Sequence, residues 1–156
     1  GATQGMTLAI NVAAMLIAFL AFIALIDYVL ALLHPALSLA SLFSVVFAPA
    51  AFLIGVASAD VGAVADLLGT KIVATEFVAY VKLTTEYQDL IEPRSFVLAT
   101  YALTGFANFG SVGILLGGLG GMAPERRGDV ARLGMRALFG GFVATLINAS
   151  IASLLI

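Results

Sequence analysis

The stretch SFVLATYALTGFANFGSVGILLGGLGGMA, residues 95–123, carries no charged side chain over its whole length. As a helix it is long enough to cross the roughly 30 Å of hydrocarbon in a bilayer. It is also dense in glycine, which weakens a helix by about 1 kcal/mol per residue relative to alanine. We therefore expect a transmembrane helix that is broken around Gly105 to Ser111. A break at membrane depth is tolerated only where the freed backbone groups face protein, water or a ligand, so the break is itself a candidate site.

The composition of the whole chain points to lipid as its solvent. Of 156 residues, 62% are hydrophobic and 10% are charged, and the mean hydropathy is +1.15. An ordinary soluble domain is nearer half apolar and a quarter charged. We expect an all-α polytopic membrane protein with transmembrane helices, one re-entrant helical hairpin and one broken helix.

Charge and residue usage exclude several classes of function. The net charge is −2, and the one basic cluster is small and mixed with acidic residues, so nucleic acid is not an expected partner. There is no cysteine and only one histidine, His34, which excludes disulfides, thiolate metal sites and a histidine-based metal centre. No nucleophile–base pair appears, so we expect neither an enzyme nor a bound cofactor.

Residues 1–60 predict two transmembrane helices. The first runs from about Leu8 to Leu33, and the second runs from Ser38 to Ala59 with an expected kink at Pro49. The segment lacks a basic region before its first apolar run, which indicates mature structure and not a signal peptide. Because the sequence does not start with Met, we expect a fragment or a trimmed chain.

Residues 61–92 predict the re-entrant hairpin. Asp66, Lys71 and Glu76 lie at intervals of five residues, and five residues rotate a helix by about 140° net, so the three charges do not share one face. A simple lipid-facing helix would expose at least one charge to hydrocarbon, at about 2.5–3.5 kcal/mol. A hairpin buried in protein, with its tip near Thr75 and Glu76, resolves this conflict.

After the broken helix, residues 124–136 predict a charged connector and residues 137–156 a final transmembrane helix. Four of the seven basic residues fall in the connector, whereas the loop 82–94 is rich in acidic residues. The positive-inside rule places the connector in the cytoplasm, and the acidic loop and the C-terminus outside.

Several ordered motifs together resemble the C-terminal half of the concentrative nucleoside transporters. They are NVAAML at 11–16, GTK at 69–71, EFVAY at 76–80, GFANFGS at 105–111 and PERR at 124–127. The resemblance covers essentially the whole chain, and it implies a symporter coupled to Na⁺ or H⁺, assembled as a homotrimer from two inverted repeats. It also implies a multi-pass protein of the bacterial inner membrane. The upstream repeat, which supplies most of the coupling-ion site and reads the nucleobase, is not in this sequence.

The same resemblance implies four substrate-binding residues for a uridine-like nucleoside. Glu76 matches the hairpin carboxylate that accepts the ribose hydroxyls, Asn108 an amide that contacts ribose, Ser111 a nearby hydroxyl, and Phe106 an aromatic residue of the pocket. A carboxylate suits this role because it accepts both hydroxyls of a vicinal diol in charge-assisted hydrogen bonds. The sequence departs from the family pattern at Thr75, usually asparagine, and at Gly110, often serine.

Other interpretations of the same residues stay open at this point. Glu76 could be a structural charge, Asn108 could only cap or join helices, and Lys71 could neutralise Asp66 or Glu76. Gly113, Gly117 and Gly121 form a small-xxx-small series typical of close helix packing. The whole chain could also be a gate-type domain of another ion transporter, or a non-transporting subunit of a membrane assembly.

Overall fold

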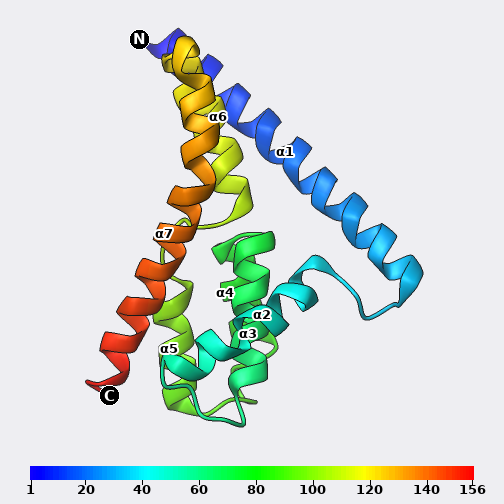
Figure 1. Ribbon diagram of the computed structural model, residues 1–156, viewed down its shortest axis with the longest axis vertical. Coiled ribbons are helices and arrows are strands. Elements are labelled where there is room, and N and C mark those ends of the chain that lie inside the picture. The colour runs from blue at the N-terminus through cyan, green and yellow to red at the C-terminus, as the bar shows by residue number, and fades with distance from the viewer.

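A computed structural model describes residues 1–156 as seven α-helices and one 3₁₀ turn, with no strand, which confirms the all-α prediction (Figure 1). Their bounds are α1 Ala2–Leu33, α2 Leu39–Leu53, α3 Val61–Val73, α4 Glu76–Thr85, α5 Pro93–Leu103, α6 Phe109–Met122, η1 Pro124–Arg126 and α7 Arg127–Ser153.

Two helical segments are long and apolar enough to cross a membrane, Ala2–Leu33 and Pro124–Ser153. Both expose large apolar side chains, among them Ile17 at 69% and Phe139 at 70%. The first half of α1 packs on α6, and farther along Asp27 accepts a hydrogen bond from the backbone N–H of Leu39 at the start of α2. The α7 helix runs along α6 and then along α5 (Figure 1).

The second helix is shorter than the predicted span 38–59. The α2 helix has 15 residues and ends at Leu53, so its length is about 22 Å, less than the hydrocarbon thickness. Pro49 lies inside α2 without ending it. The chain instead turns at Gly55, whose φ of 91° is a conformation that glycine adopts without strain.

The charged stretch 124–136, predicted as a connector, is helical in the structure. After the short turn η1, α7 begins at Arg127 and continues without interruption to Ser153. Asp129 contacts both Arg126 and Arg132 at a spacing of three residues, which supports a helical first turn.

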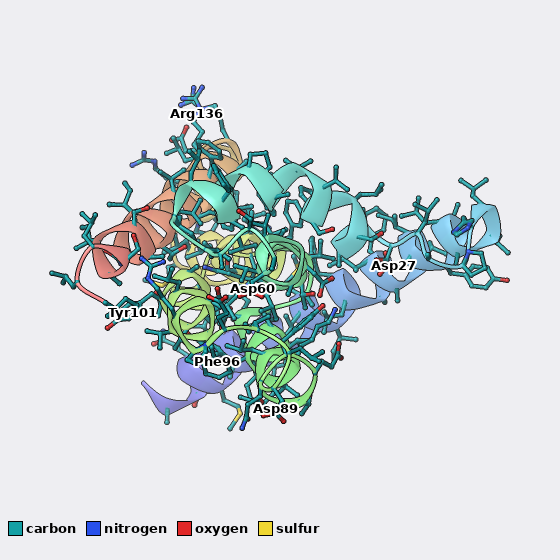
Figure 2. The ribbon with its side chains drawn as sticks, turned by 90° about the horizontal axis from the view of Figure 1, so that it is seen from below. Asp27, Asp60, Asp89, Phe96, Tyr101 and Arg136 are labelled. Carbon is teal, nitrogen blue, oxygen red and sulfur yellow. The ribbon has the colours of Figure 1, made fainter.

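The core is centred on α3, of which nine residues are buried. The α2 helix packs closely on α3, because the missing side chain of Gly69 lets the backbone of Ala40 approach. Asp60, just before α3, is 6% exposed and accepts a hydrogen bond from the backbone N–H of Glu92. In Figure 2, which views the molecule from below, Asp60 lies near the centre of the view, whereas Arg136 and Asp89 lie at opposite edges.

Candidate functional site

The turn of the α3–α4 hairpin lies at Ala74 and Thr75. The α3 helix ends at Val73 and α4 begins at Glu76, so the two arms are separated by two residues. Thr75 is the N-cap of α4, and its Oγ1 accepts a hydrogen bond of 3.3 Å from the backbone N–H of Val78. Threonine therefore performs the capping role for which asparagine would also be suited.

The segment predicted as a broken helix consists of α5 and α6, with residues 104–108 between them. Gly105 has a φ of 84°, and a Cβ atom added there would lie 2.8 Å from Thr145 Cγ2 of α7. Both the backbone conformation and the close approach of α7 require glycine at this position. Ser111, predicted as the end of the break, lies in the first turn of α6.

Asn108 is the N-cap of α6 and is 1% exposed. Its Oδ1 accepts a hydrogen bond of 2.7 Å from the backbone N–H of Ser111. In return, Ser111 Oγ accepts from the Asn108 N–H at 3.3 Å and donates to the Asn108 carbonyl at 2.6 Å. The cap thereby fixes the direction of the Asn108 side chain, and its amide nitrogen points away from the helix that it caps.

The structure brings Glu76 and Asn108 together. Asn108 Nδ2 donates a hydrogen bond of 2.8 Å to Glu76 Oε2, which joins the hairpin to the break. Glu76 is half-buried, and its other carboxylate oxygen has no protein donor. A carboxylate with a free oxygen therefore lies beside an amide that has a second free N–H hydrogen.

Phe106 does not contact the pair formed by Glu76 and Asn108. Its side chain is 63% exposed. With Ser111 it lines a pocket of about 240 Å³ between the break and α7, and neither Glu76 nor Asn108 is part of that lining.

Lys71 has partners that the sequence did not indicate. Its Nζ donates to the carbonyls of Ala102 and Thr104 and to Thr145 Oγ1, and no ion pair joins it to Asp66 or Glu76. Asp66 is paired instead with Lys82 at 2.6 Å. Lys71 therefore forms no direct ion pair with either carboxylate, although the Glu76 charge still acts on its ammonium group over a longer distance. No sequence signal identifies backbone carbonyls 31 and 33 positions away as the acceptors.

Of the predicted small-residue series on α6, only one glycine makes a close helix contact within the chain. A Cβ at Gly117 would lie 3.3 Å from Met15 Cγ of α1, whereas Gly113 and Gly121 have open space around that position.

Comparison with known proteins adds the family. A family model described as "Na+ dependent nucleoside transporter C-terminus" matches residues 1–153. The chain belongs to this family. As a member of this family the chain is an all-α membrane protein. Helices that face lipid expose apolar side chains, which accounts for the apolar surfaces of α1 and α7.

Two relatives illustrate how much of a nucleoside transporter the chain represents. An uncharacterized transporter of Haemophilus influenzae is 45% identical over 100% of this chain and 40% of its own length. Sodium/nucleoside cotransporter 1 of Sus scrofa is 42% identical over 99% of this chain and 27% of its own length. The chain thus spans less than half of the curated relatives that it matches.

Solved structures of the transporter CNTnw give the same picture in three dimensions. A variant in an outward-facing state has a TM-score of 0.90 at 38% identity, over 99% of this chain and 40% of that one. CNTnw in an inward-facing substrate-bound state has a TM-score of 0.75 at 39% identity, over 99% of this chain and 38% of that one. The helices of this chain are therefore arranged more like those of the outward-facing structure.

Proposed function

We propose that this chain is the C-terminal portion of a cation-coupled nucleoside symporter, and that Glu76 and Asn108 bind the ribose of the nucleoside. The observation that carries the proposal is the hydrogen bond between Asn108 Nδ2 and Glu76 Oε2, which places a carboxylate and an amide side by side at the meeting point of two interrupted helices. Non-helical backbone at membrane depth is the usual setting of substrate sites in secondary transporters.

The unused hydrogen-bonding groups of this pair suit a vicinal diol. The free oxygen of Glu76 can accept from the two ribose hydroxyls, while the second N–H of Asn108 can donate to a ribose oxygen. Hydrogen bonds to an ionised carboxylate are about twice as strong as neutral ones, and a site of low dielectric increases their strength further. A ligand without the hydroxyls would leave the half-buried carboxylate without these partners.

Ser111 and Phe106 support the site in different ways. The Ser111 hydroxyl makes both of its hydrogen bonds with the backbone of Asn108, so we assign it the role of holding the amide in place. The ring of Phe106 is exposed beside the break, and we propose that it becomes part of the binding site once other segments of the full-length protein are present.

We propose the remaining properties from the resemblance to this family. The substrate would be a uridine-like nucleoside, and the coupling ion Na⁺ or H⁺, with Na⁺ favoured by the description of the family and by the names of the mammalian relatives. The full-length protein would be a homotrimer and a multi-pass protein of the bacterial inner membrane. The hairpin 61–92 would enter the membrane without crossing it, and the arginines of 124–136 would face the cytoplasm.

Equilibrium binding to the full-length transporter that contains this chain tests the proposal. We expect radiolabelled uridine to bind, and 2′,3′-dideoxyuridine to bind at least about 100-fold more weakly, because a site built for hydroxyls rejects an analogue that lacks them. Equal affinities for the two ligands would refute the ribose assignment. Absence of nucleoside binding would favour a gate-type domain of an ion transporter or a non-transporting subunit.

A further inference from the structure

The ammonium group of Lys71 is buried without a carboxylate partner. Its side chain is 0% exposed, and the ion pairs of the structure involve other residues. Its three N–H hydrogens match three oxygen acceptors: Ala102 O at 2.9 Å, Thr104 O at 2.8 Å and Thr145 Oγ1 at 3.0 Å. The ring of Phe142 lies below, with its centroid 5.5 Å from Nζ. Burying a charge is costly, and here the three hydrogen bonds compensate part of that cost in the absence of an ion pair.

Two of the three acceptors are backbone carbonyls that the helix break leaves without partners. The last four carbonyls of an α-helix have no donor within the helix. In α5, the Thr100 carbonyl accepts from the Tyr80 hydroxyl at 2.7 Å, and the Tyr101 carbonyl accepts from the Thr104 N–H at 3.2 Å. Lys71 serves the Ala102 carbonyl and the Thr104 carbonyl just beyond the helix end. Two carbonyls and a hydroxyl at the C-terminal end of a half-helix are also the ligands with which transporters hold a monovalent cation.

The hairpin turn between α3 and α4 lies beside the break between α5 and α6, and the charges of Lys71 and Glu76 suit the dipoles of the four helix ends at this place. Lys71 lies in the last turn of α3 and contacts the end of α5, and both of these C-terminal ends carry partial negative charge. Glu76 lies in the first turn of α4 and is bonded to Asn108, the N-cap of α6, and both of these N-terminal ends carry partial positive charge. The hairpin is therefore joined to the broken helix on both sides of the break.

The connection made by Lys71 and the connection between Glu76 and Asn108 differ in whether they leave hydrogen-bonding groups for a ligand. In the proposed function, one carboxylate oxygen of Glu76 and one N–H of Asn108 are left for the sugar, whereas all three donors of Lys71 are already used inside the protein. Thr145 strengthens this arrangement, because its hydroxyl donates to the Phe142 carbonyl at 2.8 Å and so presents its lone pairs to Lys71. The lysine thus ties α3, the end of α5 and α7 together, independently of substrate.

We propose that Lys71 is a tethered cation: its ammonium group occupies a three-oxygen monovalent-cation site at the end of α5, and by doing so it positions residues 104–108 so that Asn108 reaches Glu76. Lys71 is a positioning residue in this scheme, since it acts on the nucleoside only through Asn108. The inference rests on the proposed function for its effect on nucleoside affinity, but not for the existence of the cation site.

The test removes the Lys71 side chain and supplies its ammonium group as a free ion. The change Lys71→Ala deletes the atoms of n-propylammonium, so that ion can refill the site in the full-length transporter. We expect Lys71→Ala to weaken uridine binding by about tenfold or more, because misplacing a binding group by 1 Å has effects of this size. We expect n-propylammonium at millimolar concentration to restore at least about a third of the lost affinity, and neutral 1-propanol to restore none.

Lys82→Ala is the matched control, because Lys82 is half-buried, lies on the same hairpin and is paired with Asp66 outside this site. It should leave uridine affinity within about twofold, as expected for a partly exposed ion pair, and should not respond to the amine. Wild-type affinity in folded Lys71→Ala, or a loss that n-propylammonium does not reduce, would overturn the proposal.

Thr145→Val covers the case in which Lys71→Ala does not fold. It removes one of the three acceptors and keeps the shape of the side chain, and we expect faster amide hydrogen exchange in peptides covering residues 104–108. Unchanged exchange there would overturn the cation site even if uridine binds normally. If the wild-type protein binds no nucleoside, the proposed function fails, while this exchange measurement still decides the role of Lys71.

Discussion

Glu76 and Asn108 are 32 positions apart in the sequence, and a hydrogen bond of 2.8 Å joins their side chains. Glu76 begins the returning arm of a hairpin, and Asn108 begins the second half of a broken helix. Each residue thus lies at a helix N-terminus, where the backbone favours negative charge and offers free N–H groups. Helix capping fixes the Asn108 side chain, and the hydrogen bond to Asn108 in turn holds the Glu76 carboxylate.

Replacing Glu76 by glutamine should reduce nucleoside affinity while preserving the fold. The glutamine side chain could still accept the hydrogen bond from Asn108, but it lacks the charge that strengthens bonds from a diol. We expect the Kd for uridine to rise about 10- to 100-fold, the equivalent of losing roughly 1.5–3 kcal/mol, with little change for 2′,3′-dideoxyuridine. Isothermal titration calorimetry on the full-length protein measures the Kd for each of the two ligands. Glu86→Gln, an exposed site on the same hairpin, is the control, and equal losses for both ligands would assign Glu76 a structural role.

Two substitutions of Asn108 should separate helix capping from ligand binding. Serine is a good N-cap but is too short to bring a donor to Glu76, so Asn108→Ser should weaken uridine binding and nearly preserve thermal stability. Asn108→Ala loses the cap as well, at a further cost of about 1 kcal/mol in stability. Thermal unfolding in detergent measures the contribution of the cap, and uridine affinity measures the contribution of the amide to ligand binding. If both variants lose stability equally and Asn108→Ser retains wild-type affinity, the amide contributes only to the fold.

Gly105→Ala should destabilise the break. The positive φ of 84° opposes any side chain, and the new methyl group would lie 2.8 Å from Thr145 Cγ2. We expect a loss of about 1–3 kcal/mol. Adding Thr145→Ser, which removes that methyl group and keeps the hydroxyl for Lys71, should recover part of this loss. Gly113→Ala is the control, since it lies within α6 with open space at the Cβ position and should be neutral or slightly stabilising. Equal melting temperatures for Gly105→Ala and Gly113→Ala would contradict the conclusion that position 105 requires glycine.

Gly69→Ala should loosen the contact between α2 and α3. A Cβ at Gly69 would clash with the backbone carbonyl of Ala40, and backbone atoms yield less readily than a flexible side chain. We expect a destabilisation of about 1–3 kcal/mol, visible as a lower melting temperature. Gly62→Ala, on the same helix with open space around it, should show no such decrease. A neutral Gly69→Ala would mean that α2 moves away from α3 at little cost.

The amino-acid sequence was enough to assign the chain's class, its family and the places where its helices are interrupted. The glycines near residue 105 and the charges at Asp66, Lys71 and Glu76 act locally, through backbone freedom and through the cost of charge in hydrocarbon, so they can be recognised without knowing any neighbour. The motifs around Glu76 and Asn108 likewise identified both residues of the pair.

Which groups meet became clear only from the packing of the helices. The five-residue spacing showed that the three hairpin charges face different directions, but their partners proved to be Lys82 for Asp66, carbonyls of α5 for Lys71 and an amide for Glu76. The shortness of α2 and the helical continuation through residues 127–136 were also not predicted. A side chain's partner is set by how separate helices pack, and packing depends on the whole three-dimensional arrangement, not on the spacing of residues along one segment.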